Sequence, residues 1–80
     1  MEIIKEKPWS YVLFDDGKGW ALTFLIGGVV EVDVTVRLTA TEIDMIKADE
    51  KNILSIMKNV ERNRQANVAR EIIPPIWPPR

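Results

Sequence analysis

Glu31 and Asp33 are spaced like two carboxylates that could do chemistry together. They alternate with valines, so an extended strand places both side chains on one face, roughly 7 Å apart. Carboxylate pairs at comparable separations serve glycoside hydrolysis and metal binding. However, Thr35 and Arg37 continue the same alternation, which is typical of a solvated sheet face. We therefore interpret Glu31, Asp33 and Arg37 as surface charges that steer a partner, and a carboxylate-dependent enzyme is the distant alternative.

Basic residues in the C-terminal half form a second candidate surface. Residues 1–50 carry ten acidic and five basic side chains, whereas residues 51–80 carry two acidic and six basic ones. A basic strip along a helix can bind phosphate backbones. The sequence pI of about 5.4 and the interleaved Glu61 favour a solvated helix face, so nucleic-acid binding is the alternative function. The strip consists of Lys51, Lys58, Arg62, Arg64 and Arg70.

The chain contains no histidine and no cysteine. Zinc sites built from these residues, Ser-His-Asp triads, Cys-His dyads and disulfides are therefore excluded within one chain. No motif calls for a cofactor, and the longest apolar run, residues 20–30, is shorter than the ~20 residues of a membrane span. No signal peptide is visible at the N-terminus. We expect one cytoplasmic domain without enzymatic activity.

Two stretches are predicted to form a β-hairpin around Asp16-Gly17: residues 9–14 and the apolar run that begins at Trp20. Asp15 and Asp16 also suggest a cation loop, but no further ligand spacing follows and we favour a type I′ turn. In that register the pairs are Leu13 with Trp20, Tyr11 with Leu22 and Trp9 with Phe24.

Residues 30–38 alternate between apolar and polar side chains and are predicted to form the next strand. Matching the dry faces requires a three-residue loop or a bulge at Gly27 to Val29. The pairs would then be Phe24 with Val32, Leu22 with Val34 and Trp20 with Val36. Residues 2–6 are a candidate for one more short strand.

Thr39 and Glu42 have the spacing of a capping box, which predicts a helix start. Apolar spacing predicts helices over residues 40–48 and 50–64 with a break near Asp49, and one kinked helix is the alternative. The expected fold class is α+β: an antiparallel three- to four-stranded meander packed on two C-terminal helices. We expect a single domain over residues 1–73 and an extended Pro-rich tail over residues 74–80.

The apolar residues near the C-terminus, Ile73, Ile76 and Trp77, are the candidate anchors for a partner. They are too apolar for an isolated tail, so we expect them to pack on their own domain or on a second copy. A recruitment motif for an aromatic-lined groove, flanked by Arg80, is the alternative. The sheet face that carries Val12 and Phe14 is also apolar, and a homodimer would cover it.

The chain resembles a group of small uncharacterised bacterial proteins in which a β-meander precedes helices. The resemblance rests on Trp9-x-Tyr-Val-Leu, Asp16-Gly17, Leu38-Thr39-x-x-Glu42-Ile43 and Arg70-Glu71-Ile72. Some proteins of this kind are immunity partners of secreted toxins, but these motifs are structural and assign no functional residue. We therefore expect a protein-binding module of the immunity or adaptor kind, in a homodimer or small hetero-complex. Its steering charges would be Glu31, Asp33 and Arg37, or Lys58, Arg62 and Arg64 on the basic helix.

Overall fold

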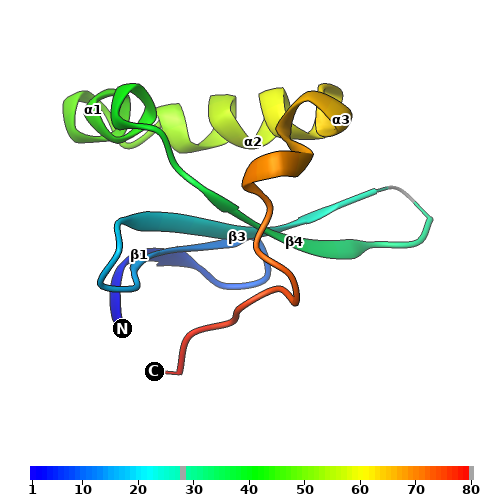
Figure 1. Ribbon diagram of the computed structural model, residues 1–80, viewed down its shortest axis with the longest axis horizontal. Coiled ribbons are helices and arrows are strands. Elements are labelled where there is room, and N and C mark those ends of the chain that lie inside the picture. Colours follow the sequence, from blue (N-terminus) through cyan, green and yellow to red (C-terminus); the bar gives the residue numbers. More distant parts are fainter. Residues whose placement is uncertain (28, 80) are drawn as a thin grey trace.

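The computed structural model describes residues 1–27 and 29–79. These residues form a four-stranded antiparallel sheet followed by helices, which confirms the expected α+β class (Figure 1). The strands lie in the order β1-β2-β3-β4, so β1 and β4 are the edges. Their bounds are Glu2–Lys7 for β1, Tyr11–Asp15 for β2, Trp20–Ile26 for β3 and Val32–Arg37 for β4.

The helical part begins at the predicted capping box. Thr39 Oγ1 accepts the N–H of Glu42 at 3.1 Å, and Glu42 Oε1 accepts the N–H of Thr39 at 2.9 Å. A break at Asp49 separates the first two helices, which confirms two helices rather than one kinked helix. No helix of the described residues is long and apolar enough to cross a membrane. The elements are α1 (Ala40–Ala48), α2 (Asn52–Arg62), α3 (Arg64–Asn67) and a 3-10 turn, η1 (Val68–Arg70).

The first hairpin is wider than predicted. Tyr11 lies opposite Phe24 and Leu13 opposite Leu22, so the connection spans residues 16–19. The predicted two-residue type I′ turn is therefore wrong. Asp15 Oδ1 accepts the N–H of Gly17 at 2.8 Å, and Asp16 Oδ1 accepts the N–H of Lys18 at 3.0 Å. These two turns, each closed by an aspartate side chain, stabilise the backbone of the loop. The loop is therefore longer than the two-residue turn predicted from Asp16-Gly17.

The pairing of β3 with β4 is also displaced by two residues from the predicted register. Phe24 pairs with Val34 and Leu22 with Val36, so the loop spans residues 27–31 rather than three residues. Gly28, in the middle of the predicted loop, lies outside the described residues. Because side chains alternate with a period of two, a displacement by two residues keeps every side chain on its predicted face.

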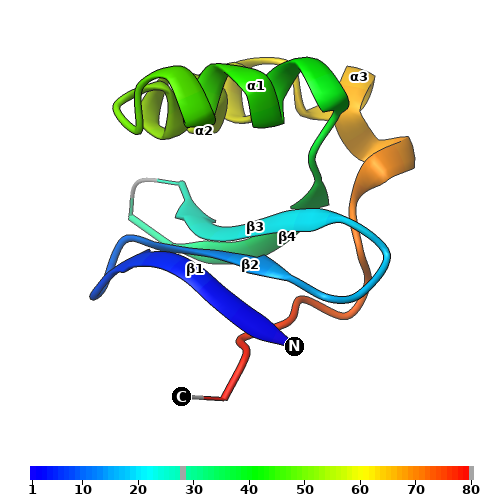
Figure 2. The ribbon, with the colours of Figure 1, turned by 90° about the vertical axis from the view of Figure 1, so that its left-hand side faces the viewer.

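The helices cover one face of the sheet, as predicted (Figure 2). The core between the two layers is built from alternate residues of β2, β3 and β4 and from one stripe of the helices. Its centre is fully buried, with Leu13, Leu22, Ile53, Val36 and Val60 all at 0% exposure. The remaining members are Tyr11, Phe24, Ile26, Val34, Leu38, Ile46 and Ile56.

The chain after η1 crosses the opposite face of the sheet, so the sheet lies between the helices and this segment (Figure 2). Ile72 and Ile76 pack against Val12, Phe14 and Ala21. The expectation that the tail packs on its own domain therefore holds for Ile76.

Two buried threonines hold the crossing segment. Thr35 Oγ1 accepts the N–H of Ile76 at 2.8 Å, and Thr23 Oγ1 donates to the Ile76 carbonyl. The two hydroxyls lie 2.6 Å apart, and because the Thr23 proton is used on Ile76, Thr35 donates to Thr23. The predicted solvated face is therefore wrong for Thr35, which is 1% exposed.

Glu42 and Arg70 join the first helix to the segment that leads to the tail. Arg70 donates to both carboxylate oxygens of Glu42, with Nη2 2.9 Å from Oε2, and its Nη1 also donates to the Arg37 carbonyl at 3.0 Å. Burial raises the pKa of Glu42, but the hydrogen bonds from Arg70 and Thr39 outweigh burial and lower the pKa below its ordinary value of 4.5. The ionised form of Glu42 is therefore favoured in the folded chain.

We expect Glu42→Gln to lower the free energy of unfolding at pH 7 by about 2 kcal/mol, because it leaves Arg70 without its counter-charge. Since the pKa of Glu42 is lower in the folded state, its contribution is present above pH 4.5 and is lost as the pH falls below that value. The variant should therefore lose less stability than the wild type between pH 5 and pH 3, as urea titrations measure. Glu61→Gln, at an exposed helical position, is the control and should follow the wild type. Identical stability curves for Glu42→Gln and the wild type would contradict the prediction.

Candidate protein-interaction surface

An apolar cleft opens where the β1–β2 turn, β3 and the tail meet. Four residues line it, Pro8, Trp9, Leu25 and Trp77, and its volume is about 500 Å³. This volume lies within the range of ligand-binding clefts, and no ionisable side chain lines it. We call these four residues the aromatic cleft.

Trp9 is placed in the aromatic cleft by a tight turn between β1 and β2. The N–H of Ser10 donates to the Lys7 carbonyl at 3.0 Å, with Pro8 and Trp9 at the two central positions. Trp9 has φ of 65°, in the left-handed region where a turn of this kind normally places glycine. Its side chain is 97% exposed. The predicted strand position of Trp9 opposite Phe24 is therefore wrong, and Pro8 was the signal in the sequence that a turn begins there.

Trp77 forms the other wall of the cleft. Its Nε1 donates to Asp33 Oδ2 at 2.8 Å, and the neighbouring Ile76 is fixed by the two threonines. Even so, Trp77 remains 46% exposed. The polar end of the indole is thus satisfied, while much of its apolar body faces solvent.

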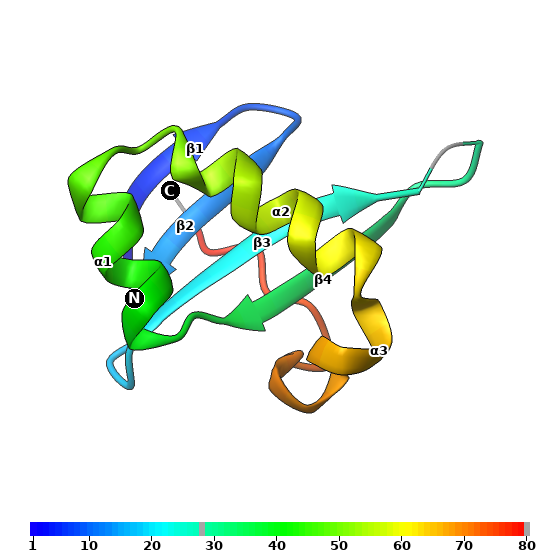
Figure 3. The ribbon, with the colours of Figure 1, turned by 90° about the horizontal axis from the view of Figure 1, so that it is seen from above.

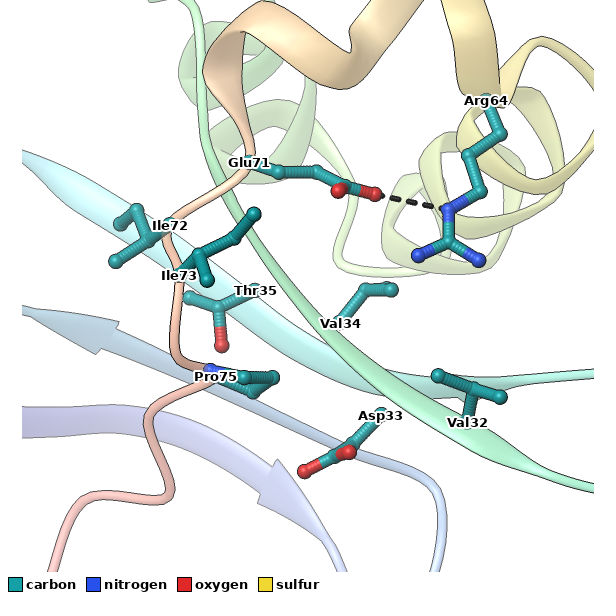
Figure 4. Close-up of a pocket in the computed structure, with 9 residues that line it drawn as sticks. All are labelled: Val32, Asp33, Val34, Thr35, Arg64, Glu71, Ile72, Ile73 and Pro75. Carbon is teal, nitrogen blue, oxygen red and sulfur yellow. Dashed lines mark hydrogen bonds and ion pairs between the residues drawn. The ribbon is translucent and has the colours of Figure 1, made fainter.

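A second hollow, the edge groove, runs beside the outer edge of β4 (Figure 4). Its volume is about 270 Å³. Ile73 is 79% exposed and Val32 43% exposed, whereas Val34 is buried. The edge groove is lined by Val32, Asp33, Val34, Thr35, Arg64, Glu71, Ile72, Ile73 and Pro75.

The β3–β4 loop, next to the edge groove, exposes two more valines. Val29 is fully exposed and Val30 is 74% exposed. Gly27 has φ of 113°, and a Cβ at this position would lie 2.3 Å from the Val30 carbonyl oxygen. Only glycine fits there, so the backbone at the start of the loop is tightly constrained.

The structure separates the predicted carboxylate pair. Glu31 lies in the loop before β4 and is exposed, whereas Asp33 is half-buried beneath Trp77. Arg37, predicted on the same face, forms a two-pronged ion pair with Asp16, at 2.8 and 2.6 Å. The hydrogen bonds from Arg37 lower the pKa of Asp16 well below its ordinary range. Arg37 thus fastens the β2–β3 loop to β4.

The basic residues of the predicted strip do not share one environment. Arg70 is bound to Glu42, and Arg64 donates from Nε to Glu71 Oε1 at 3.0 Å. Lys58 and Arg62 lie exposed on α2. The structure therefore gathers Asp33, Ile73 and Trp77 around the tail and leaves Lys58 and Arg62 on the helical layer.

Comparison of the chain with protein-family models, with curated proteins and with solved structures found no match. The largest apolar side chains that the fold leaves in solvent, Trp9 and Trp77, line one cleft. The most exposed apolar residue of the tail, Ile73, lines the neighbouring groove.

We expect Trp9→Gly to keep the free energy of unfolding or raise it by up to about 1 kcal/mol, because glycine adopts the left-handed conformation without strain. A buried tryptophan would instead lose about 3–5 kcal/mol on truncation. Chemical denaturation of the two proteins measures the difference. A loss of more than 1 kcal/mol would show that the Trp9 ring stabilises the domain and would contradict its assignment as a surface residue.

We expect Thr35→Val to release the tail from the sheet, because the N–H of Ile76 loses its acceptor at a buried position. The cost is about 1–3 kcal/mol. The amide of Ile76 should exchange faster with deuterium, and the indole N–H of Trp77 should move toward its solvent-exposed chemical shift. Thr41→Val, at an exposed position on α1, is the matched control. Unchanged exchange at Ile76 would mean that the threonine contacts do not hold the tail.

Proposed function

We propose that this chain is a non-enzymatic protein-binding domain that holds its partner against the aromatic cleft and the adjoining edge groove. The observation that carries the proposal is Trp9, a large apolar side chain at 97% exposure on a left-handed backbone. Such a conformation is unfavourable for any residue other than glycine, and no packing of the ring within the domain offsets it. Strained positions of this kind cluster at binding sites.

The neighbourhood of Trp9 supports the same proposal. Trp77 and Leu25 line the cleft with it, and Ile73 and Val32 lie across the tail in the edge groove. Rigid aromatic anchors surrounded by aliphatic side chains are typical of binding hot spots. The Asp33 carboxylate, next to both hollows, provides a charge that orients a partner.

The partner in this proposal is a second copy in a homodimer or a different protein in a small hetero-complex, in a role of the immunity or adaptor kind. Nucleic-acid binding is less well supported than the sequence suggested. Arg64 and Arg70 are engaged by carboxylates of their own domain, so Lys51, Lys58 and Arg62 are the exposed remainder of the strip.

The proposal is tested with the double variant Trp9→Ala, Ile73→Ala, in which both side chains are largely exposed. The control is Leu54→Ala, Val68→Ala, which removes exposed apolar side chains from the helical layer. Sedimentation velocity over a range of concentrations measures self-association. A tagged pull-down from lysate of the source cells, with nuclease treatment and a salt step, identifies hetero-partners by mass spectrometry.

We expect a dimer or a salt-stable protein partner with wild type and control, weakened at least 30-fold in the double variant, which corresponds to about 2 kcal/mol of hot-spot energy. Equal association of all three proteins would remove the aromatic cleft as the binding surface. Nucleic acid that is released by salt and by Arg62→Glu would instead support the nucleic-acid alternative.

A further inference from the structure

The two edges of the sheet are protected to very different degrees. On β1, the pairing with β2 is irregular between Ile3 and Lys5, and charged side chains follow along the strand to Lys7. A bulge and charged residues are the usual means by which an edge strand avoids pairing with another chain. The N-terminal half of β4 has no bulge, since its pairing with β3 is regular from Val32 onward, and the exposed valines of the loop precede it.

The C-terminal half of β4 is covered by its own chain. The N–H of Ile72 donates to the Thr35 carbonyl at 2.7 Å, Glu71 forms a bridge with Val36, and Arg70 reaches the Arg37 carbonyl. The tail then turns under the sheet and leaves the strand edge (Figure 4). Within the described part of the chain, no strand pairs with the outer side of β4 between Val32 and Val34.

Strand geometry shows which backbone groups of β4 face outward where the tail does not cover the edge. The Thr35 carbonyl faces outward, because it accepts a hydrogen bond from Ile72. The N–H and C=O of one residue point to the same side, and every second residue repeats the direction. The N–H and C=O of Asp33 therefore face the edge groove, ready to pair with an added strand.

The side chains beside these groups define the chemistry of that strand. Val32 and Val34 point to the helical face, where an apolar partner side chain would be covered. Asp33 lies on the tail face, where it accepts the indole N–H of Trp77, and the exposed Glu31 is a second acidic residue just before the strand. The Arg64–Glu71 pair is neutral, whereas neither Asp33 nor Glu31 forms an ion pair with the described residues. The open half of the edge is therefore apolar on one face and acidic on the other.

The β4 edge of a second copy does not match this edge. An antiparallel pairing of two β4 edges around Val32 places Glu31 opposite Asp33 of the other copy, and a pairing around Asp33 places the two aspartates opposite each other. Side chains in such pairs have Cβ atoms about 5 Å apart, and like charges there are destabilising. A strand that alternates apolar with basic side chains satisfies both faces.

We propose that the open half of β4 accepts an extended segment of a partner protein as a fifth strand, in which apolar residues alternate with lysine or arginine. This inference rests on the proposed function and specifies its binding mode and its partner chemistry. The main-chain hydrogen bonds to Asp33 supply affinity, and Glu31 and Asp33 select the basic side chains.

The test uses a short capped peptide in which valine alternates with lysine, and a second peptide with glutamate in place of lysine. Each is titrated into the whole protein while amide chemical shifts and hydrogen exchange are followed by NMR. We expect the lysine peptide to shift the amides of Asp33 and Thr35 and to slow the exchange of the Asp33 amide. The glutamate peptide should leave both unchanged.

Two variants separate the backbone contribution from the charge contribution. Asp33→Pro removes the carboxylate together with the outward N–H, at a position where an edge strand tolerates proline, so it should abolish peptide binding. The N–H contributes the difference between this variant and one that removes charge alone. The double variant Glu31→Gln, Asp33→Asn keeps the backbone and an acceptor for Trp77, and it should weaken binding about fivefold. The double variant also keeps the test valid if Asp33→Pro does not fold.

Four outcomes would overturn the strand-addition proposal: no binding of the lysine peptide, equal binding of the two peptides, shifts confined to β1 or to the aromatic cleft, or protection of Asp33 that rises with protein concentration alone. The last outcome would identify a second copy as the occupant. A partner lost by Trp9→Ala, Ile73→Ala but retained by Asp33→Pro would leave the proposed function standing without strand addition.

Discussion

The ion pair between Glu42 and Arg70 is the contact on which the arrangement of the chain depends. Glu42 closes the capping box at the start of α1, and the same carboxylate receives Arg70 from η1. Arg70 in turn reaches the Arg37 carbonyl at the end of β4. One largely buried carboxylate thus joins the sheet, the first helix and the C-terminal segment. Figure 3 shows the helices lying over the sheet. The direction in which the chain leaves the helical layer follows from this junction, because Ile72 begins its pairing with β4 two residues after Arg70.

The tail that crosses the sheet covers apolar surface that so small a domain would otherwise leave in solvent. A domain of 80 residues buries only part of its unfolded surface, and a sheet with one face in water would leave Val12 and Phe14 exposed. Ile72 and Ile76 cover them, and the two threonines satisfy the polar backbone that comes with Ile76. Hydroxyl groups can replace a neighbouring strand in this role because each donates one hydrogen bond and accepts others. The same threonine hydrogen bonds hold Trp77 at the rim of the aromatic cleft. The packing of the tail on the sheet and the geometry of the candidate site therefore depend on one set of contacts.

Local patterns predicted the α+β class and the helix-facing side of the sheet correctly, but not the register of the strands, the turn at Trp9, the burial of Thr35 or the path of the tail. Leu13 and Leu22 were assigned to the core because period-two alternation specifies a face. A displacement by two residues changes every residue pair between two strands but leaves each side chain on the same side of the sheet. The alternation therefore does not distinguish the two registers. Asp15 and Asp16 decide the wider loop through their own side-chain hydrogen bonds, which compete with the two-residue turn. Thr35 illustrates the other limit: its burial comes from Ile76, which is 41 residues away, and no local pattern encodes that contact. For the site, the apolar tail was identified from composition, whereas Trp9 was missed because its aromatic character suggested a strand.

Trp9, Val29 and Val30 differ from ordinary exposed apolar residues because the backbone that carries them, or that lies next to them, is conformationally constrained. A single exposed leucine or valine on a helix needs no explanation, because every folded surface contains many apolar atoms. Trp9 is different, since its left-handed backbone is unfavourable and its ring gains no burial within the domain. The Gly27 turn also holds Val29 and Val30 outward on a constrained backbone that admits no side chain at position 27. The two valines lie next to the uncovered edge of β4, whereas Trp9 lies in the turn between β1 and β2. The opposite edge, β1, has an irregular pairing. This asymmetry is what a sheet requires if one edge is to exclude other chains and the other is to receive one.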